Sequence, residues 1–140
     1  MMYIGLDLGT SGLKGVLIDD DQRVLVEATA PLTVQRHHEG WSEQSPADWI
    51  AAAEAVLDAL AAHGLAAVRG IGLSGQMHGA TLLDARDEVL RPCILWNDTR
   101  SHEEAAELDG DPMFRRLTGN IVFPGFTAPK LLWVARHEPR

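Results

Sequence analysis

The sequence has a single cysteine, Cys93, and little that would direct the chain to nucleic acid or to a membrane. One cysteine cannot form a disulfide within the chain, so a reducing compartment is the simpler expectation. The 12 Lys and Arg are outnumbered by 20 Asp and Glu, and a net charge of −8 disfavours binding to nucleic acid or anionic membranes. No apolar run approaches the roughly 18 residues of a membrane span. The first residues resemble no signal peptide. We therefore expect a cytoplasmic protein with no nucleic-acid or membrane partner.

The composition is close to that of an average globular domain. The chain has 140 residues, of which 46% are hydrophobic and 23% are charged, so it can bury a substantial core. This length fits one domain or part of one, and two full domains are not expected. Disordered and fibrous chains are excluded.

Three short runs rich in β-forming residues open the sequence, at residues 3–7, 12–18 and 24–32. Residues 9–12 link the first two runs, and residues 19–22 link the second to the third. Both links are rich in turn-forming residues, so the first thirty residues predict a meander of antiparallel hairpins.

A helix is predicted to begin at Pro46, because Ser45 can cap its first turn and proline suits the first helical position. Apolar residues then recur at helical spacing as far as Gly64, which gives the helix one face for packing on a sheet. The residues of this face are Trp49, Ile50, Ala53, Val56, Leu57 and Leu60.

The second half of the sequence predicts three more strands and three shorter helices. The strands are expected at residues 68–73, 80–83 and 89–95, with a turn at 84–88. The helices are expected at residues 100–108, 112–117 and 129–137, the last closed by Pro139. A meander followed by a helix and another strand favours an α/β domain with a mixed sheet.

The segment 7–14 carries the clearest chemistry. An acid at the end of a strand, Asp7, is followed by two glycines that flank Thr10 and Ser11 in a tight turn. Such a turn offers backbone N–H groups and hydroxyls to an anion. Asp7 could hold a hydrated Mg²⁺, and Lys14 could neutralise phosphate charge. An ordinary hairpin is an equal alternative, and a Walker A loop is excluded because its glycine spacing is absent.

Residues 70–75 match the dinucleotide-binding pattern Gly-x-Gly-x-x-Gly, but their context argues against a Rossmann site. That site requires a helix that opens at the third glycine. Here the glycines lie inside a strand-like run, and residues 80–83 return to β-forming residues. A reductase that binds NAD is therefore the weakest alternative.

Residues 76–79 follow this strand, where an α/β sheet usually presents the loops that contact a ligand. Gln76 and His78 can hydrogen-bond hydroxyl groups, and Met77 can lie against the apolar face of a small molecule. The alternative is a hairpin turn with a partly exposed histidine.

A second polar segment follows the strand predicted at 89–95. It combines a flat ring, an amide, an acid and a guanidinium, a mixture that binds sugars, in the residues Trp96, Asn97, Asp98 and Arg100. The alternative is a helix cap by Asn97 or Asp98, with Arg100 in a surface ion pair. The six histidines show no metal-binding spacing, so no zinc site is expected.

Taken together, these residues resemble the FGGY carbohydrate kinases, within the superfamily of sugar kinases, Hsp70 and actin. Residues 3–14 resemble the first phosphate motif of that family. The Asp-x-Gly-Thr string alone would indicate only the superfamily. Four later blocks are more specific and resemble the members that act on D-xylulose; they are residues 75–81, 95–98, 119–120 and 124–133.

The resemblance implies a ribonuclease-H-like (actin-like ATPase) fold in which a cleft between two domains transfers phosphoryl from MgATP to the 5-hydroxyl of D-xylulose. It implies that Asp7 organises Mg²⁺, through water, together with the phosphates. The residues implied to bind ATP are Gly9, Thr10, Ser11 and Lys14. The residues implied to contact the sugar are Met77 and His78, with Gln76, Trp96, Asn97 and Asp98 as neighbours.

Members of this family are several times longer than 140 residues, so residues 1–140 are expected to form only part of the N-terminal domain. The rest of that domain, the catalytic base and the C-terminal domain would lie outside this chain, which alone is expected to lack activity. A homodimer is a possible assembly. The alternatives are a related pentulose or polyol kinase and a non-catalytic sugar-binding module.

Overall fold

A computed structural model describes residues 1–139, which fold as two compact units. The first unit contains Met1–Val34 and Ser45–Gln76, and the second contains Gln35–Gln44 and the residues from Met77 onward. The boundary falls between Gln76 and Met77, inside the segment 76–79 that is predicted to contact the sugar. The phosphate-binding and sugar-binding residues predicted above therefore belong mainly to different units.

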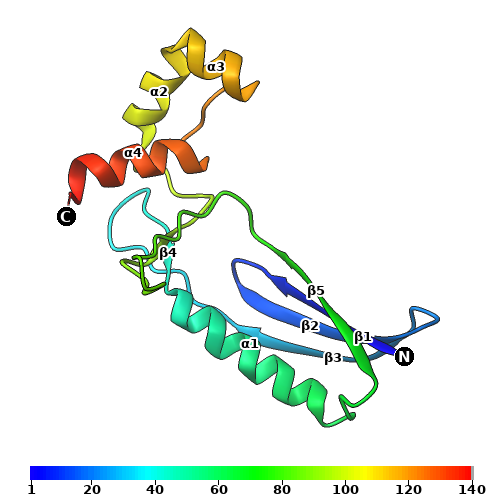
Figure 1. Ribbon diagram of the computed structural model, residues 1–140. Helices are drawn as coiled ribbons and strands as arrows, with labels where there is room; N and C mark the ends of the chain where they lie inside the picture. Colours follow the sequence, from blue (N-terminus) through cyan, green and yellow to red (C-terminus); the bar gives the residue numbers. More distant parts are fainter. Residues whose placement is uncertain (140) are drawn as a thin grey trace. The chain divides into compact units, whose positions relative to one another are not determined.

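A four-stranded mixed sheet forms the first unit (Figure 1). Its strands are β1 (Met2–Leu8), β2 (Gly12–Asp19), β3 (Val24–Pro31) and β5 (Val68–Gly75), in the order β3-β2-β1-β5. The pairs β1/β2 and β2/β3 are antiparallel, whereas β1 and β5 are parallel. The predicted meander and the predicted mixed sheet are both confirmed.

Helix α1 (Pro46–Ala61) runs along one face of this sheet (Figure 1). The buried core between them consists of Ile4, Leu13, Leu17, Ala52, Val56 and Leu60. The helix begins at Pro46 as predicted, but the Ser45 side chain makes no capping hydrogen bond within the described residues. Ile50 is 62% exposed, so the packed face of the helix is narrower than the sequence predicts.

Strand β2 and helix α1 approach each other closely at Gly15. A Cβ atom on Gly15 would lie 2.3 Å from Cγ1 of Val56 and 3.2 Å from Cδ1 of Leu60. Contacts below 3 Å between such carbon atoms are repulsive, so the absence of a side chain at Gly15 sets the distance between helix and sheet.

The glycines of the dinucleotide-like pattern all lie within β5, and the residues after Gly75 form a loop. The strand pairs in parallel with β1 along this stretch. A strand through all three glycines has no helix N-terminus at which a pyrophosphate could bind. The prediction that these glycines lie inside a strand, with no helix opening at the third, is therefore confirmed.

The second unit is built from a small two-stranded sheet and three helices. The sheet pairs β4 (Glu43–Gln44) with β6 (Cys93–Ile94), and the helices are α2 (His102–Gly110), α3 (Pro112–Thr118) and α4 (Thr127–His137). Ala80, Ile94 and Trp133 form its buried apolar cluster. The three predicted helices are confirmed to within two residues at each end. Strand β4 has no counterpart among the sequence predictions.

The strands predicted at 80–83 and 89–95 are wrong in their extent. The structure has isolated bridges at Ala80↔Ile94 and Leu83↔Val89, and regular pairing only in the two-residue strand β6. Pro92 has no N–H to contribute to a ladder, which limits pairing at this point. The turn predicted at 84–88 is confirmed, since the backbone N–H of Asp84 donates to the carbonyl oxygen of Glu88.

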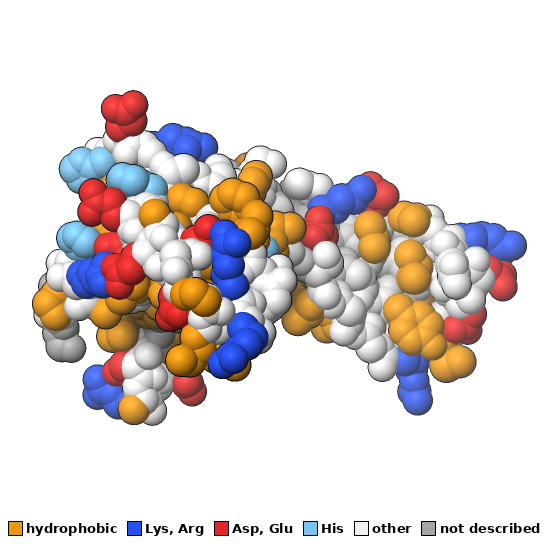
Figure 2. Space-filling view, turned by 90° about the horizontal axis from the view of Figure 1, so that it is seen from above, with side chains coloured by type: hydrophobic (Ala, Val, Ile, Leu, Met, Phe, Trp, Pro, Cys, Tyr) orange, Lys and Arg blue, Asp and Glu red, His pale blue; other side chains and the backbone are white. Residues whose placement is uncertain are grey.

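The surface carries charges of both signs. On the face that Figure 2 shows, acidic and basic side chains are interspersed with apolar ones. Within residues 1–139 there is no helix with the length and apolar character that a bilayer crossing requires.

Candidate active site

Asp7 lies on the sheet face opposite helix α1. Side chains alternate between the two faces of a strand, and Ile4, Leu6 and Leu8 of β1 pack toward the helix. The neighbouring positions, including Gly5 and Asp7, therefore face the other side. The Asp7 side chain is exposed there.

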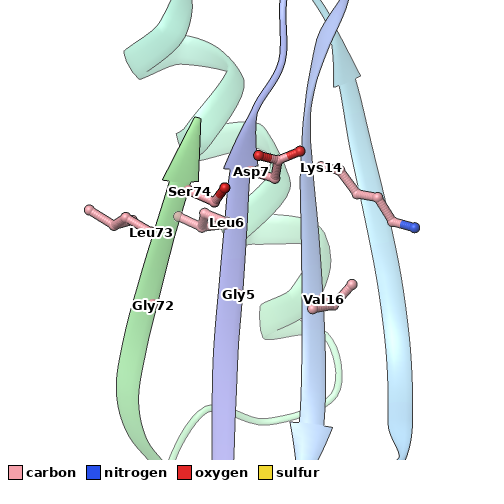
Figure 3. Close-up of a pocket in the computed structure, with 8 residues that line it drawn as sticks. All are labelled: Gly5, Leu6, Asp7, Lys14, Val16, Gly72, Leu73 and Ser74. Atoms are coloured by element: carbon pink, nitrogen blue, oxygen red, sulfur yellow. The ribbon is translucent and has the colours of Figure 1, made fainter. Parts of the chain in front are cut away.

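An open cavity of about 330 Å³ lies on this face of the sheet (Figure 3). In the strand register, Asp7 stands between Lys14 of β2 and Ser74 of β5. Gly5 and Gly72 are paired below them and have no side chains, so backbone forms part of the floor. The lining residues are Gly5, Leu6, Asp7, Lys14, Val16, Gly72, Leu73 and Ser74.

The predicted phosphate turn is tied to the end of β5. The Gly9 N–H donates to the carbonyl oxygen of Gly12 over 3.0 Å, which closes the hairpin. The Thr10 hydroxyl lies 3.3 Å from Oε1 of Gln76, and the Gln76 N–H donates to the Leu8 carbonyl over 2.8 Å. Five residues of the first unit that are candidates from the sequence thus lie at the same end of its strands. They are Asp7, Gly9, Thr10, Ser11 and Gln76.

Lys14 projects from β2 on the same face and pairs with Glu27 of β3. Its Nζ lies 2.8 Å from a carboxylate oxygen of Glu27, and both side chains are about half exposed. An exposed ion pair of this kind contributes about 0–1 kcal/mol. The pair can therefore be exchanged for a phosphate at little cost.

The groups around Asp7 fit a magnesium ion that is bound partly by water and phosphate, and they do not fit a metal ion whose ligands all come from the protein. The described residues contain no cluster of three or more His, Cys, Asp or Glu that could bind a metal. Mg²⁺ usually keeps several waters and binds proteins through one or two carboxylates together with substrate phosphates. One exposed carboxylate beside a turn of amides and hydroxyls matches that pattern.

Met77 and His78 begin the second unit and are both exposed. His78 has a φ of 60°, the left-handed region that non-glycine residues rarely adopt. Its ring lies 4.8 Å from the ring of Phe126, measured between centroids. The backbone at His78 is therefore in an uncommon conformation, and the side chains of Met77 and His78 are exposed to solvent.

Lys130 of α4 lies directly behind this loop and is fully buried. Its Nζ donates to the carbonyl oxygen of His78 over 2.8 Å and to that of Gly125 over 2.7 Å. No role for Lys130 is predicted from the sequence. The available signal was a basic residue three positions before Trp133, on the helix face that packs into the core.

Burial lowers the pKa of Lys130 to about 8 from 10.5, although the nearby carboxylate of Asp98 favours the charged form. Between these two values the unfolded chain keeps a proton that the folded protein releases. The free energy of unfolding should therefore rise with pH across this window, by at most about 1.4 kcal/mol per pH unit. We expect urea unfolding to show this additional slope relative to a Lys130→Met variant, and equal slopes would contradict the lowered pKa.

The segment 96–98 combines exposed and buried groups. Trp96 is 44% exposed, whereas Asp98 is fully buried. One oxygen of Asp98 accepts from the N–H of Ser42 over 2.6 Å, and Arg100 donates to both oxygens over 2.7–2.9 Å. The side-chain oxygen of Asn97 is buried and finds no hydrogen-bond donor within residues 1–139. Arg100 does form an ion pair, as the alternative interpretation of this segment expected, but its partner is Asp98 and the pair is buried rather than on the surface.

Arg100 is the centre of a buried network that the sequence did not predict. Its guanidinium lies 3.7 Å from the ring centroid of Trp41 and 5.1 Å from that of Trp133. It also pairs with Glu43 over 2.8 Å, and Glu43 in turn pairs with Arg91. Aromatic faces and two carboxylates together compensate for burying this cation. The network fixes the segment that carries Trp96 and Asn97.

Comparison with known proteins places this fold and these residues in one class. A family model for the N-terminal domain of the FGGY family of carbohydrate kinases matches residues 2–140. The xylulose kinase of Escherichia coli K12 is 54% identical over 140 residues, which cover 99% of this chain and 29% of that protein.

Solved structures of sugar kinases are also similar to this chain. The crystal structure of a xyloylose kinase from Brucella ovis has a TM-score of 0.95 and 66% identity, covering 99% of this chain and 30% of its own. The xylulose kinase from Rhodospirillum rubrum has a TM-score of 0.90 and 37% identity, with the same coverage.

The mixed sheet with flanking helices is thus part of an actin-like ATPase fold, as found in sugar kinases. The chain belongs to the FGGY family of carbohydrate kinases. It spans about 29% of the length of the curated relatives that it matches.

Proposed function

We propose that the whole protein transfers the γ-phosphoryl group of ATP to the 5-hydroxyl of D-xylulose, giving D-xylulose 5-phosphate, in the cytoplasm. The observation that carries the proposal is the 54% identity to a xylulose kinase over 99% of this chain. Because the chain spans about 29% of that relative, we propose that residues 1–140 form part of the N-terminal domain and are inactive alone.

In this proposal the first unit binds the nucleotide. Gly9, Thr10 and Ser11 would bind its phosphates, and Lys14 would exchange Glu27 for a phosphate oxygen. Asp7 would hold Mg²⁺ through water, and the ion would neutralise charge on the phosphates. Phosphoryl transfer depends mostly on positioning and charge neutralisation. The exposed carboxylate beside a hydrogen-bonded turn supports this assignment.

The second unit would bind the ketose, mainly through Met77 and His78. Their exposure and the fixed backbone at His78 support the assignment. Trp96 and Asn97 would complete the set within this unit, and the buried Asp98 would hold their segment rather than contact the sugar. Gln76, which directly precedes the loop, belongs to the first unit. Asp98 is unsuited to the role of general base because both of its oxygens already accept hydrogen bonds within the chain. We therefore propose that the base lies elsewhere in the whole protein.

Replacing His78 with alanine should weaken sugar binding. The loss of a hydrogen bond from the imidazole to a sugar hydroxyl should raise the KM for D-xylulose about 10-fold. The KM for ATP should change little. Steady-state kinetics of the whole protein measure both values, and His63→Ala, at an exposed site after α1, is the matched control. An unchanged KM for the sugar would remove His78 from the proposed site.

Specificity separates the proposal from its neighbours in the family. Values of kcat/KM for D-xylulose, D-ribulose and glycerol compare transition-state binding directly. A preference for D-xylulose supports the proposal, and a preference for either other substrate assigns a related kinase instead. Sugar binding by calorimetry without ATP turnover in the whole protein would indicate a binding module.

A further inference from the structure

We propose that Lys130 is a positioning residue for the ketose, because its buried ammonium fixes the backbone that presents Met77 and His78. The proposal rests on the proposed function, since it concerns the same site. It assigns to Lys130 a role that acts through main-chain carbonyls rather than through contact with the sugar or the nucleotide.

The partners of Lys130 are unusual for a buried cation. A buried ammonium is costly unless it is hydrogen-bonded and compensated by charge. Lys130 is fully buried, yet both of its recorded hydrogen bonds go to main-chain carbonyls, of His78 and Gly125. An apolar side chain would fill the same space without the desolvation cost. Unlike an apolar side chain, the lysine also donates hydrogen bonds to two separate loops.

The His78 loop needs such a donor. A left-handed backbone at a non-glycine residue persists only where the surrounding structure holds it. The next fixed point along the backbone is Ala80, whose N–H donates to the carbonyl oxygen of Ile94 in β6. The hydrogen bond from Lys130 to the His78 carbonyl therefore restrains the loop at the residue with the unusual φ of 60°.

The second carbonyl connects the other proposed sugar segment. A Cβ on Gly125 would lie 2.4 Å from the carbonyl oxygen of Trp96, so these two backbones are in direct contact. Phe126, the next residue, contacts the ring of His78. By holding the Gly125 carbonyl, Lys130 places the loop 124–126 against Trp96 and against His78. Three loops are thereby fixed around one ammonium.

The neutral amine could retain this function. An ammonium has three N–H donors, and a neutral amine keeps two, which is enough for the two carbonyls. The geometry therefore depends on the donors of Lys130 rather than on its charge. This distinction selects the variants for a test.

The experiment uses the whole protein with Lys130→Met, which removes the donors but keeps an unbranched apolar chain. Lys130→Gln is one bond shorter and keeps two N–H donors. Arg136→Met is the matched control, because it removes a cation from the same helix that pairs with Glu107 and Glu104 of α2 and bonds to neither His78 nor Gly125. The measurements are the KM for D-xylulose, the KM for ATP, kcat and thermal stability. Hydrogen exchange is followed in residues 76–79, in the loops at Trp96 and at 124–126, and in β1 and β2.

We expect Lys130→Met to raise the KM for D-xylulose about 10-fold, because the carbonyls of His78 and Gly125 lose the donor of two partly buried hydrogen bonds. The KM for ATP should stay near that of the unchanged protein, and Lys130→Gln should recover part of the loss. Exchange in residues 76–79 should accelerate by a similar factor, while exchange in β1 and β2 should not change. Arg136→Met should alter none of these values.

A sugar KM and loop exchange that are unchanged in Lys130→Met would overturn the proposal, as would a loss confined to thermal stability. If Lys130→Met does not fold, Lys130→Gln decides by the same measurements. If the unchanged protein phosphorylates no ketose, the proposed function fails. The exchange data then decide separately, since faster exchange confined to the three loops supports positioning by Lys130 and unchanged exchange overturns it.

Discussion

Replacing Asp7 with alanine in the whole protein should lower kcat by about 10³-fold, the largest effect we expect from any single substitution here. The carboxylate is exposed at the end of β1, so its loss should not disturb the packing of the sheet. What is lost is the charge that would hold Mg²⁺ against the phosphates. The KM for D-xylulose should change much less than kcat, because the residues proposed to bind the sugar belong mainly to the second unit.

Two further variants make this test specific. Asp7→Asn keeps the size of the side chain and removes only its charge, so it should lose nearly as much activity. Asp21→Ala removes another exposed acid from the turn between β2 and β3, at the opposite end of the sheet, and should retain full activity. A rate in Asp7→Ala close to that of the unchanged protein would exclude the phosphate-binding role of the turn.

Replacing Gly15 with alanine should lower the free energy of unfolding by about 2 to 3 kcal/mol, because the new methyl group overlaps Val56. Valine is stiff about χ1 in a helix and cannot rotate away. Relief therefore requires α1 to move from the sheet. Urea unfolding of the whole protein measures the effect.

A rescue variant identifies the cause. Val56→Ala removes the atom that the new Cβ would meet, so the double variant Gly15→Ala, Val56→Ala should be more stable than the sum of the two single effects predicts. Gly110→Ala, at the last residue of α2, places a Cβ that meets nothing outside its own helix within 4 Å, so it should not lower the free energy of unfolding. Strict additivity in the double variant would contradict the packing argument.

Local signals explain what the sequence could predict. The hairpins of β1 to β3 and the start of α1 depend on neighbouring residues, namely turn formers, alternation and a proline at the first helical position. The turn after Asp7 is local in the same sense, since an acid, two glycines and two hydroxyl residues are adjacent in the sequence. These parts of the fold and the phosphate-binding hypothesis needed no tertiary information.

The rest depends on contacts between distant residues. Nothing beside Asp98 in the sequence shows that Ser42 donates to its carboxylate, and nothing beside Lys130 shows that it reaches His78. The sequence therefore suggested the exposed side chains of the proposed site, together with Asp98 and Arg100, but it predicted neither the burial of these two charges nor a role for Lys130. Residues 80–83 and 89–95 are predicted as strands because they are apolar, yet much of their length forms loops and bridges.

The parallel pairing of β1 with β5 has a consequence for synthesis on the ribosome. Strands β1, β2 and β3 can pair as soon as they emerge, but the second edge of β1 waits for Val68–Gly75. Unpaired strand edges are templates for association with other chains, and long-range pairing forms slowly. Lengthening the segment that contains α1 would therefore prolong the exposure of a nascent edge to aggregation, even where the finished sheet is unchanged.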